Sequence, residues 1–190
     1  SVVAPCTTNE AGEAITAMIK NGGTGYLRLD KSSAKNCSSK DPFVIGKSRR
    51  YKEGKDITLI ATGSILGDAN IASVELKKLG IEARVVGMHS IKPIDVDEII
   101  DAATNTGGIV TIEEHNKDGG LGSAISEVCM DFGVMPNKFL RIGLDNKYSS
   151  IVGSQPYLRS RYEIDSKAII NKVKKIFNSW KSLLFKRWFS

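Results

Sequence analysis

The sequence predicts an α/β fold in which a three-layer, doubly wound and mainly parallel sheet follows a strand–helix–strand fragment. Two observations support this prediction. From residue 56 onward, short apolar runs typical of buried strands alternate with amphipathic helical segments. Glycine, proline or aspartate stands at many of the junctions, where elements begin and end. Because such alternation implies right-handed β–α–β crossovers, helices should cover both faces of the sheet.

Residues 1–30 are expected to form a strand, a helix and a second strand. Thr7 can cap the start of the helix, and Glu10 three residues later completes a capping-box pattern. Gly22 suits the end of this helix, and the run over residues 25–29 reads as a short strand.

Residues 31–55 have the polar, proline- and glycine-containing composition of a segment that connects domains. A short strand is expected within it over residues 43–45, and the domain boundary is expected near Gly54.

The second domain is expected to cover residues 56–178. Its predicted strands span residues 56–61, 81–88, 108–113 and 139–144. Its predicted helices span residues 66–79, 95–103 and 121–132, and a long stretch from residue 166. Residues 179–190 read as an amphipathic basic tail.

Composition excludes several classes of protein. Of the 190 residues, 41% are hydrophobic and 25% charged, which is ordinary for a folded globular chain. No apolar run is long enough to span a membrane, and no signal peptide is visible. Three unpaired cysteines and two histidines argue against a disulfide framework and a metal site, so a reducing cytoplasm is the expected location.

The net charge of +6 arises largely in the last segment, where residues 166–190 hold seven basic residues and no acidic one. We therefore expect no nucleic-acid partner. Apolar residues recur in this segment at three- and four-residue spacing. Its end suits weak contact with an anionic membrane surface, a partner's groove, or packing on the chain's own domain.

Two strand-to-helix loops are candidate functional segments, because ligands of doubly wound sheets bind beyond the carboxyl ends of the strands. The first, over residues 62–68, has the sequence Thr-Gly-Ser-Ile-Leu-Gly-Asp. It either offers free backbone N–H groups to an anion or is a turn that needs glycine for its backbone angles. The second, over residues 113–123, is a candidate for an acid–base site beside an anion hole or for a subunit interface. Its candidate residues are His115, Gly119, Gly120, Gly122 and Ser123.

No catalytic residue and no metal ligand is identified from the residues alone. The sequence lacks a G-x-S-x-G nucleophile turn and a phosphate-binding P-loop.

Residues 56–95 and 109–129 resemble the C-terminal domain of transketolases. The Thr-Gly-Ser turn, the Ile-Lys-Pro-Ile-Asp segment and the Glu-Glu-His…Gly-Gly-Leu-Gly-Ser loop occur in the family's order and spacing. Residues 1–29 resemble the last strand–helix–strand unit of the preceding pyrimidine-binding domain. Deoxyxylulose-phosphate synthases and the β subunits of 2-oxo-acid dehydrogenases share this pattern.

The resemblance implies an enzyme that uses thiamine diphosphate and magnesium to move a two-carbon ketol unit between sugars. It also implies that the residues holding the cofactor precede this segment, so the chain alone should bind none. The expected partner is an N-terminal section of the same enzyme, in a homodimer or heterotetramer. In this family the C-terminal domain contributes scaffold and dimer contacts rather than catalytic residues.

The same resemblance implies a contact with substrate phosphate. Family members often carry an arginine just after the strand that matches residues 26–29, and Lys31 stands there in this chain, near Arg28. Lysine keeps the positive charge but lacks the bidentate fork of arginine. Lys31 is thus either a phosphate ligand or a solvated linker residue. Two other functions stay open, a related thiamine enzyme of the synthase or dehydrogenase type and a non-enzymatic assembly or ligand-binding module.

Overall fold

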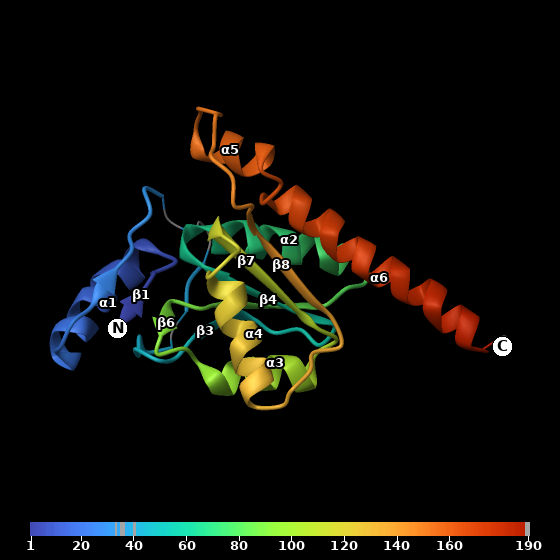
Figure 1. The fold of residues 1–190 in the computed structure, drawn as a ribbon, viewed down its shortest axis with the longest axis horizontal. Helices are drawn as coiled ribbons and strands as arrows, with labels where there is room; N and C mark the ends of the chain where they lie inside the picture. Colours follow the sequence, from blue (N-terminus) through green and yellow to red (C-terminus); the bar gives the residue numbers. More distant parts are fainter. Residues whose placement is uncertain (33, 35–36, 40, 189–190) are drawn as a thin grey trace.

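The computed structural model describes residues 1–32, 34, 37–39 and 41–188, with side chains as far as Phe177. A five-stranded sheet of order β3-β5-β4-β7-β8 forms its centre (Figure 1). The strands are β3 (Arg49–Lys52), β4 (Ile57–Thr62), β5 (Ala83–Gly87), β7 (Ile109–Asn116) and β8 (Phe139–Leu144). All neighbours are parallel except β3, which runs antiparallel to β5 at the edge. The predicted doubly wound, mainly parallel sheet is confirmed.

Burial explains why the central strands are continuous apolar runs. All six residues of β4 and all five of β5 are buried. A strand covered by helices on both faces needs apolar residues at every position, whereas a strand with one wet face alternates.

Helices form the two outer layers (Figure 1). On one face α2 (Leu66–Lys78) and α6 (Ser166–Trp188) enclose a core with β4 and β5 that includes Leu59, Leu76 and Val173. On the other face α3 (Val96–Asn105) and α4 (Leu121–Asp131) enclose a second core that includes Ile60 and Ile125. Side chains from successive strand positions thus enter opposite cores, as the pleat requires.

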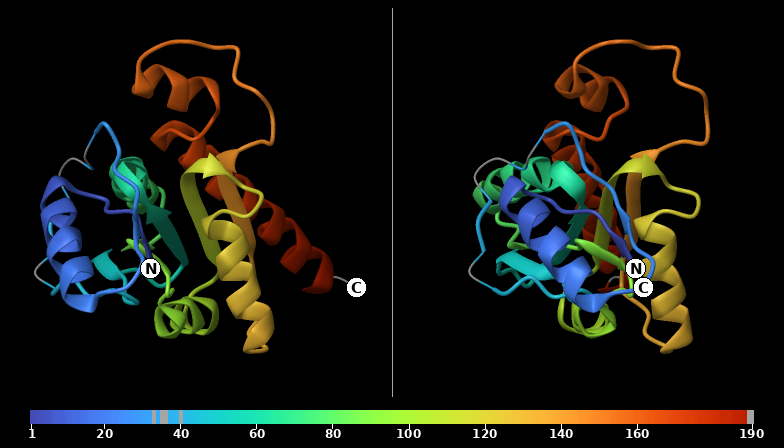
Figure 2. Two further views of the ribbon diagram at one scale, coloured as in Figure 1. Left: turned by 60° about the vertical axis from the view of Figure 1, so that its left-hand side comes forward. Right: turned by 90° about the vertical axis from the view of Figure 1, so that its left-hand side faces the viewer.

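The N-terminal unit consists of β1 (Val2–Val3), α1 (Thr8–Asn21) and β2 (Tyr26–Leu27). Thr7 caps α1 as predicted, since its Oγ1 accepts the Glu10 N–H at 3.2 Å. The unit extends the domain through a second, three-stranded sheet of order β2-β1-β6, in which β6 (Ser90–Lys92) comes from the second domain. Figure 2 shows the unit along one side of the molecule, far from the end of α6.

Several segments differ from the sequence-based expectations. The strand expected over residues 43–45 is not formed, so that prediction was wrong. Residues 49–52, within the predicted linker, instead form edge strand β3. The short elements β6 and α5 (Gln155–Arg161) were not predicted, because three to seven residues carry too little periodicity to be recognised.

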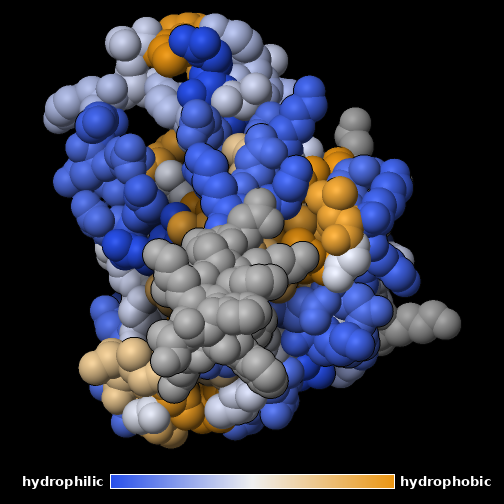
Figure 3. Space-filling model, turned by 90° about the vertical axis from the view of Figure 1, so that its right-hand side faces the viewer, coloured by the Kyte–Doolittle hydropathy of each residue, from blue (hydrophilic) through white to orange (hydrophobic). Residues whose placement is uncertain are grey.

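The last helix, α6, starts at the predicted residue and continues to Trp188. Its early part packs on the sheet as expected, since Ile169 and Val173 are fully buried. The predictions about the tail, residues 179–190, concern side chains that lie outside the described residues. Figure 3 views the molecule from the right-hand side of Figure 1. Hydrophilic residues dominate the coloured surface of that face, and the apolar surface forms smaller patches. Within the described part of the chain, no helix is both long and apolar enough to cross a membrane.

A buried polar cluster joins the N-terminal unit to the second domain. Glu10 of α1 is 1% exposed and Arg49 of β3 is 4% exposed. The Glu10 carboxylate accepts hydrogen bonds from Arg49 Nη1 at 3.3 Å, from the Tyr51 hydroxyl and from the Cys6 N–H at 2.7 Å. Burial and the adjacent carboxylate raise the pKa of Tyr51 well above its usual range, so the phenol stays a donor.

Replacing Glu10 should therefore destabilise the chain strongly. We expect Glu10→Ala to lower the free energy of unfolding by about 3–5 kcal/mol, because it leaves the Arg49 charge buried without its inner partner. Urea unfolding at neutral pH measures this difference. Glu13→Ala is the matched control, since Glu13 bonds the same Nη1 at 2.7 Å but is half-exposed. Its cost should stay within about 1 kcal/mol, and equal costs for the two variants would contradict the interpretation.

Candidate functional site

The two predicted loops meet at the carboxyl ends of β4 and β7. The order in which strands are added to the sheet reverses here, because β5 lies on one side of β4 and β7 lies on the other. Thr62 at the end of β4 is in register with Glu113 of β7. This is the place in a doubly wound sheet where a crevice forms.

The first loop bonds an anion that belongs to the chain itself. A 3₁₀ turn over Gly63–Ile65 leads into α2, and the Ser64 N–H donates to Asp30 Oδ2 at 2.7 Å. Gly63 has φ +72°, and a Cβ at this position would lie 2.7 Å from the same oxygen. The loop therefore needs glycine both for its backbone angle and for the close approach of Asp30. Of the two interpretations of this loop, the structure supports the tight turn.

The second loop is also closed by an internal carboxylate. Glu113 is 1% exposed, and it accepts the N–H groups of Leu121 at 2.7 Å and Gly122 at 3.0 Å. These are free donors at the start of α4, where a negative charge is favoured. Burial raises the pKa of Glu113, and the two N–H groups act against that rise. Gly120 has no room for a side chain, because a Cβ there would lie 2.0 Å from Glu113 Oε2.

The other predicted residues of this loop have separate surroundings. The His115 side chain is 54% exposed, and its Nδ1 lies 2.9 Å from the Asn116 carbonyl and 3.9 Å from Glu113 Oε2. Ser123 accepts from the Gly119 N–H at 3.2 Å and donates to the Lys117 carbonyl at 3.0 Å. The Gly119 and Ser123 groups thus hold the loop closed, while His115 faces outward.

Arg28 is held by the chain as well. Its Nη1 lies 3.1 Å from Asp30 Oδ1, and its Nη2 donates to the Glu114 carbonyl at 3.2 Å. The guanidinium therefore links the end of β2 to the end of β7. Among the described residues, by contrast, the exposed Lys31 ammonium has no hydrogen bond or ion pair.

A cavity of about 280 Å³ brings the two groups of predicted residues together. Arg28, His115, Gly119 and Gly120 line it, together with Lys92 from β6. Gly122, Ser123 and Lys31 do not border this cavity. It lies between the N-terminal unit and the second domain, so both parts are needed to form it.

Sequence reasoning missed the most connected side chain of the region, Arg159 of α5. Its guanidinium bonds Glu114 Oε2 through Nε at 3.0 Å and Nη2 at 2.6 Å, and it reaches Asp68 Oδ2 at 2.9 Å and Ser64 Oγ at 2.7 Å. Figure 1 shows α5 beyond the end of β7. Only Pro156 near the helix start was a local signal for α5. No local signal indicated the partners of Arg159, which come from 45 to 95 residues away.

The described residues do not fit thiamine diphosphate or magnesium. They contain no cluster of three or more His, Cys, Asp or Glu that could hold a metal ion. The two loop starts that would suit a diphosphate already bond Asp30 and Glu113.

Comparisons with known proteins agree with this geometry. The family model described as "Transketolase, C-terminal domain" matches residues 46–169. A 6-deoxy-6-sulfo-D-fructose transketolase subunit from Clostridium sp. (strain MSTE9) is 30% identical over 177 residues, which cover 93% of this chain and 54% of that protein. An apulose-4-phosphate transketolase subunit from Phocaeicola vulgatus is 32% identical over 171 residues, which cover 89% of this chain and 54% of the relative.

Two further matches show how widely this segment occurs. The enzyme 1-deoxy-D-xylulose-5-phosphate synthase 1 from Geobacter metallireducens is 31% identical over 176 residues, covering 91% of this chain and 28% of the synthase. A solved structure described as "Split gene transketolase, inactive beta4 tetramer" superimposes with a TM-score of 0.79 at 32% identity. The superposition covers 92% of this chain and 56% of the chain in that structure.

The chain spans about half the length of the transketolase subunits that it matches. The family model covers most of the second domain, and the relatives extend the match through the N-terminal unit. This chain therefore belongs to the transketolase family and carries its C-terminal domain.

Proposed function

We propose that this chain is the C-terminal section of a thiamine-diphosphate-dependent transketolase that transfers a two-carbon ketol unit between sugars. One observation carries the proposal. Two relatives named as transketolase subunits match nearly the whole chain, and each is about twice the matched length. The remaining half of such a subunit would precede the segment matched here.

The surface of the N-terminal unit supports a partner section. Ile15, Ile19 and Tyr26 are 47%, 76% and 62% exposed on α1 and β2. Among the described strands, β2 pairs only with β1, so its outer edge keeps unpaired backbone groups. An open strand edge beside exposed apolar side chains suits the rest of a pyrimidine-binding domain.

In the assembled enzyme the preceding section would hold thiamine diphosphate and magnesium. The cofactor supplies the electron sink that stabilises a carbanion. This chain would supply scaffold and dimer contacts, in a homodimer or heterotetramer, because its loop carboxylates and arginines are already engaged with one another. Lys31 would supply a contact to substrate phosphate, since its ammonium is exposed and has no hydrogen bond or ion pair with any described residue.

A second candidate is a deoxyxylulose-phosphate synthase, because the identity to that enzyme, 31%, falls between those to the two transketolase subunits. The share of the relative that the match covers favours transketolase, because it is 54% for each subunit and 28% for the synthase. Capture of the tagged chain from its natural cell tests the choice. It should retain a polypeptide carrying the cofactor site, and the complex should transfer two-carbon units rather than form 1-deoxy-D-xylulose 5-phosphate. Formation of that product by the complex would favour the synthase instead.

The isolated chain should not bind the cofactor. Calorimetric titration with thiamine diphosphate and magnesium should show no binding heat. The described residues hold no cluster of three or more His, Cys, Asp or Glu for the metal, and the N–H groups of the two loop starts already bond Asp30 and Glu113. The complete complex serves as the positive control. Micromolar binding by the isolated chain would refute the proposed division of roles.

Lys31→Ala in the complete complex should raise KM for phosphorylated sugars roughly tenfold or more, as expected for loss of a charge-assisted contact. Steady-state kinetics with phosphorylated and unphosphorylated sugars measures the effect, and KM for the latter should not change. Lys20→Ala is the matched control, because Lys20 is an exposed lysine of the N-terminal unit. Unchanged kinetics for phosphorylated sugars would assign Lys31 to the solvated linker.

A further inference from the structure

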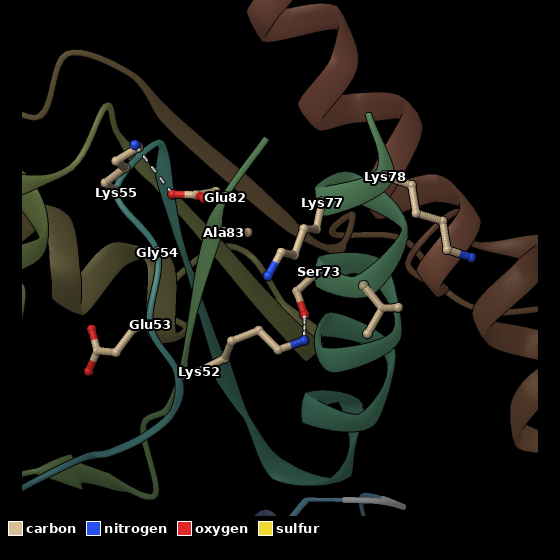
Figure 4. A pocket seen from close by; sticks show the side chains of 10 residues that line it. Lys52, Glu53, Gly54, Lys55, Ser73, Lys77, Lys78, Glu82 and Ala83 are labelled. Atoms are coloured by element: carbon tan, nitrogen blue, oxygen red, sulfur yellow. Dashed lines mark hydrogen bonds and ion pairs between the residues drawn. The ribbon is translucent and has the colours of Figure 1, made fainter. Parts of the chain in front are cut away.

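A groove of about 740 Å³ lies at the opposite end of the sheet from the two loops (Figure 4). It is bordered by Lys52 at the end of β3, by residues 53–55, by the start of β5 and by the second half of α2. Its volume is within the range of small-molecule pockets. Gly54 allows the wall to close, because a Cβ there would lie 2.3 Å from the Ala83 backbone.

The charges around this groove are unbalanced. Among the described residues that line it, four are lysines and two are glutamates. Both glutamates have other basic neighbours, since Glu53 lies 3.8 Å from Arg50 and Glu82 lies 3.5 Å from Lys55. Lys78 pairs with Glu75 at 2.7 Å, outside the lining.

Lys52 and Lys77 are the two lysines left without a carboxylate. Among the described residues neither ammonium has an acidic group within ion-pair distance, and the rest of the chain contains no Asp or Glu. Figure 4 shows the two side chains extending toward each other into the groove, from β3 and from α2, whereas Lys78 points away. The two like charges repel each other, and an anion between them would remove that repulsion.

A buried hydroxyl fixes one of these cations. Lys52 Nζ donates to Ser73 Oγ at 2.8 Å, and Ser73, which is 1% exposed, donates in turn to the Asn70 carbonyl at 2.7 Å. Ser73 is neutral, so it orients the ammonium without neutralising it and leaves further N–H donors for a ligand. Lys77 lies in the last turn of α2, where a positive charge interacts favourably with the helix dipole. The dipole does not explain why a second lysine, Lys52, is held nearby on β3.

We propose that this groove binds a small phosphate monoester with an apolar body. The phosphate would lie between Lys52 and Lys77, and the body would contact Val74, which is 45% exposed. The site is independent of the proposed transketolase activity, since it lies at the other end of the sheet from Arg28 and the two loops. Neither the cofactor nor a second section is needed to test it.

The test uses phenyl phosphate as the probe on the 190-residue chain, with binding followed by amide NMR shifts at low salt. Saturable shifts should centre on Lys52, Ser73, Lys77 and Ala83. Inorganic phosphate should bind the same residues more weakly because it lacks the apolar body, and phenol should give no saturable shift because it lacks the charge. Shifts that stay linear in concentration, or that centre elsewhere, would overturn the proposal.

Variants separate this site from general attraction to a basic chain. Lys52→Gln combined with Lys77→Gln should weaken binding at least about tenfold, the effect of losing two charge-assisted contacts. The matched controls Lys55→Gln and Lys78→Gln remove paired lysines of the same groove and should weaken binding less than about twofold. Equal weakening in all of them would overturn the proposal. Melting temperatures check the fold, and Lys77→Gln alone decides the matter if the double variant is unstable, because the Lys77 side chain has no internal partner to lose among the described residues.

Discussion

The buried contact between Glu10 and Arg49 determines how the two parts of this chain fit together. Both side chains are almost completely enclosed, and neither can lose the other without leaving a charge in the interior. The contact attaches α1 to edge strand β3. With the N-terminal unit fixed in this way, the segment after β2 lies against both loops. Arg28 bonds the Glu114 carbonyl at the end of β7, and Asp30 bonds the Ser64 N–H after β4. Together with the pairing of β1 and β6, this attachment holds the two parts on either side of the small cavity.

The carboxyl ends of the strands, where a doubly wound domain most often binds its ligand, are largely occupied by the chain itself. Asp30 and Glu113 bond the N–H groups that would otherwise attract an anion, and Arg159 bonds Glu114 and Asp68. A region whose polar groups are satisfied internally is rigid and well suited to support a neighbouring section. This agrees with the proposed role of scaffold.

Sequence patterns predicted the fold well because the central strands and long helices follow physical rules that act locally. The continuous apolar run of β4, the Thr7 cap and the amphipathic start of α6 could all be recognised without tertiary information. Edge strand β3 could not, because its Arg-Arg-Tyr-Lys sequence looks like a polar linker. Arg49 can be buried there because Glu10 and Glu13, 39 and 36 residues earlier, pair with it. The topology predicted that the two loops would lie at one site. It did not predict that Asp30 and Glu113 would accept the hydrogen bonds of the loops' backbone N–H groups. Spacing along the chain does not show which oxygen accepts a hydrogen bond from which N–H group.

The open edge of β2 has a consequence for how such a protein is made. Among the described strands the outer edge of β2 is unpaired, and Tyr26 on this strand is exposed. Such an edge is a template for any other extended segment, including the same edge of another copy. A newly made chain that does not meet the section proposed to cover this edge is therefore prone to self-association. The geometry of one two-residue strand thus makes its proposed cover a protection against self-association.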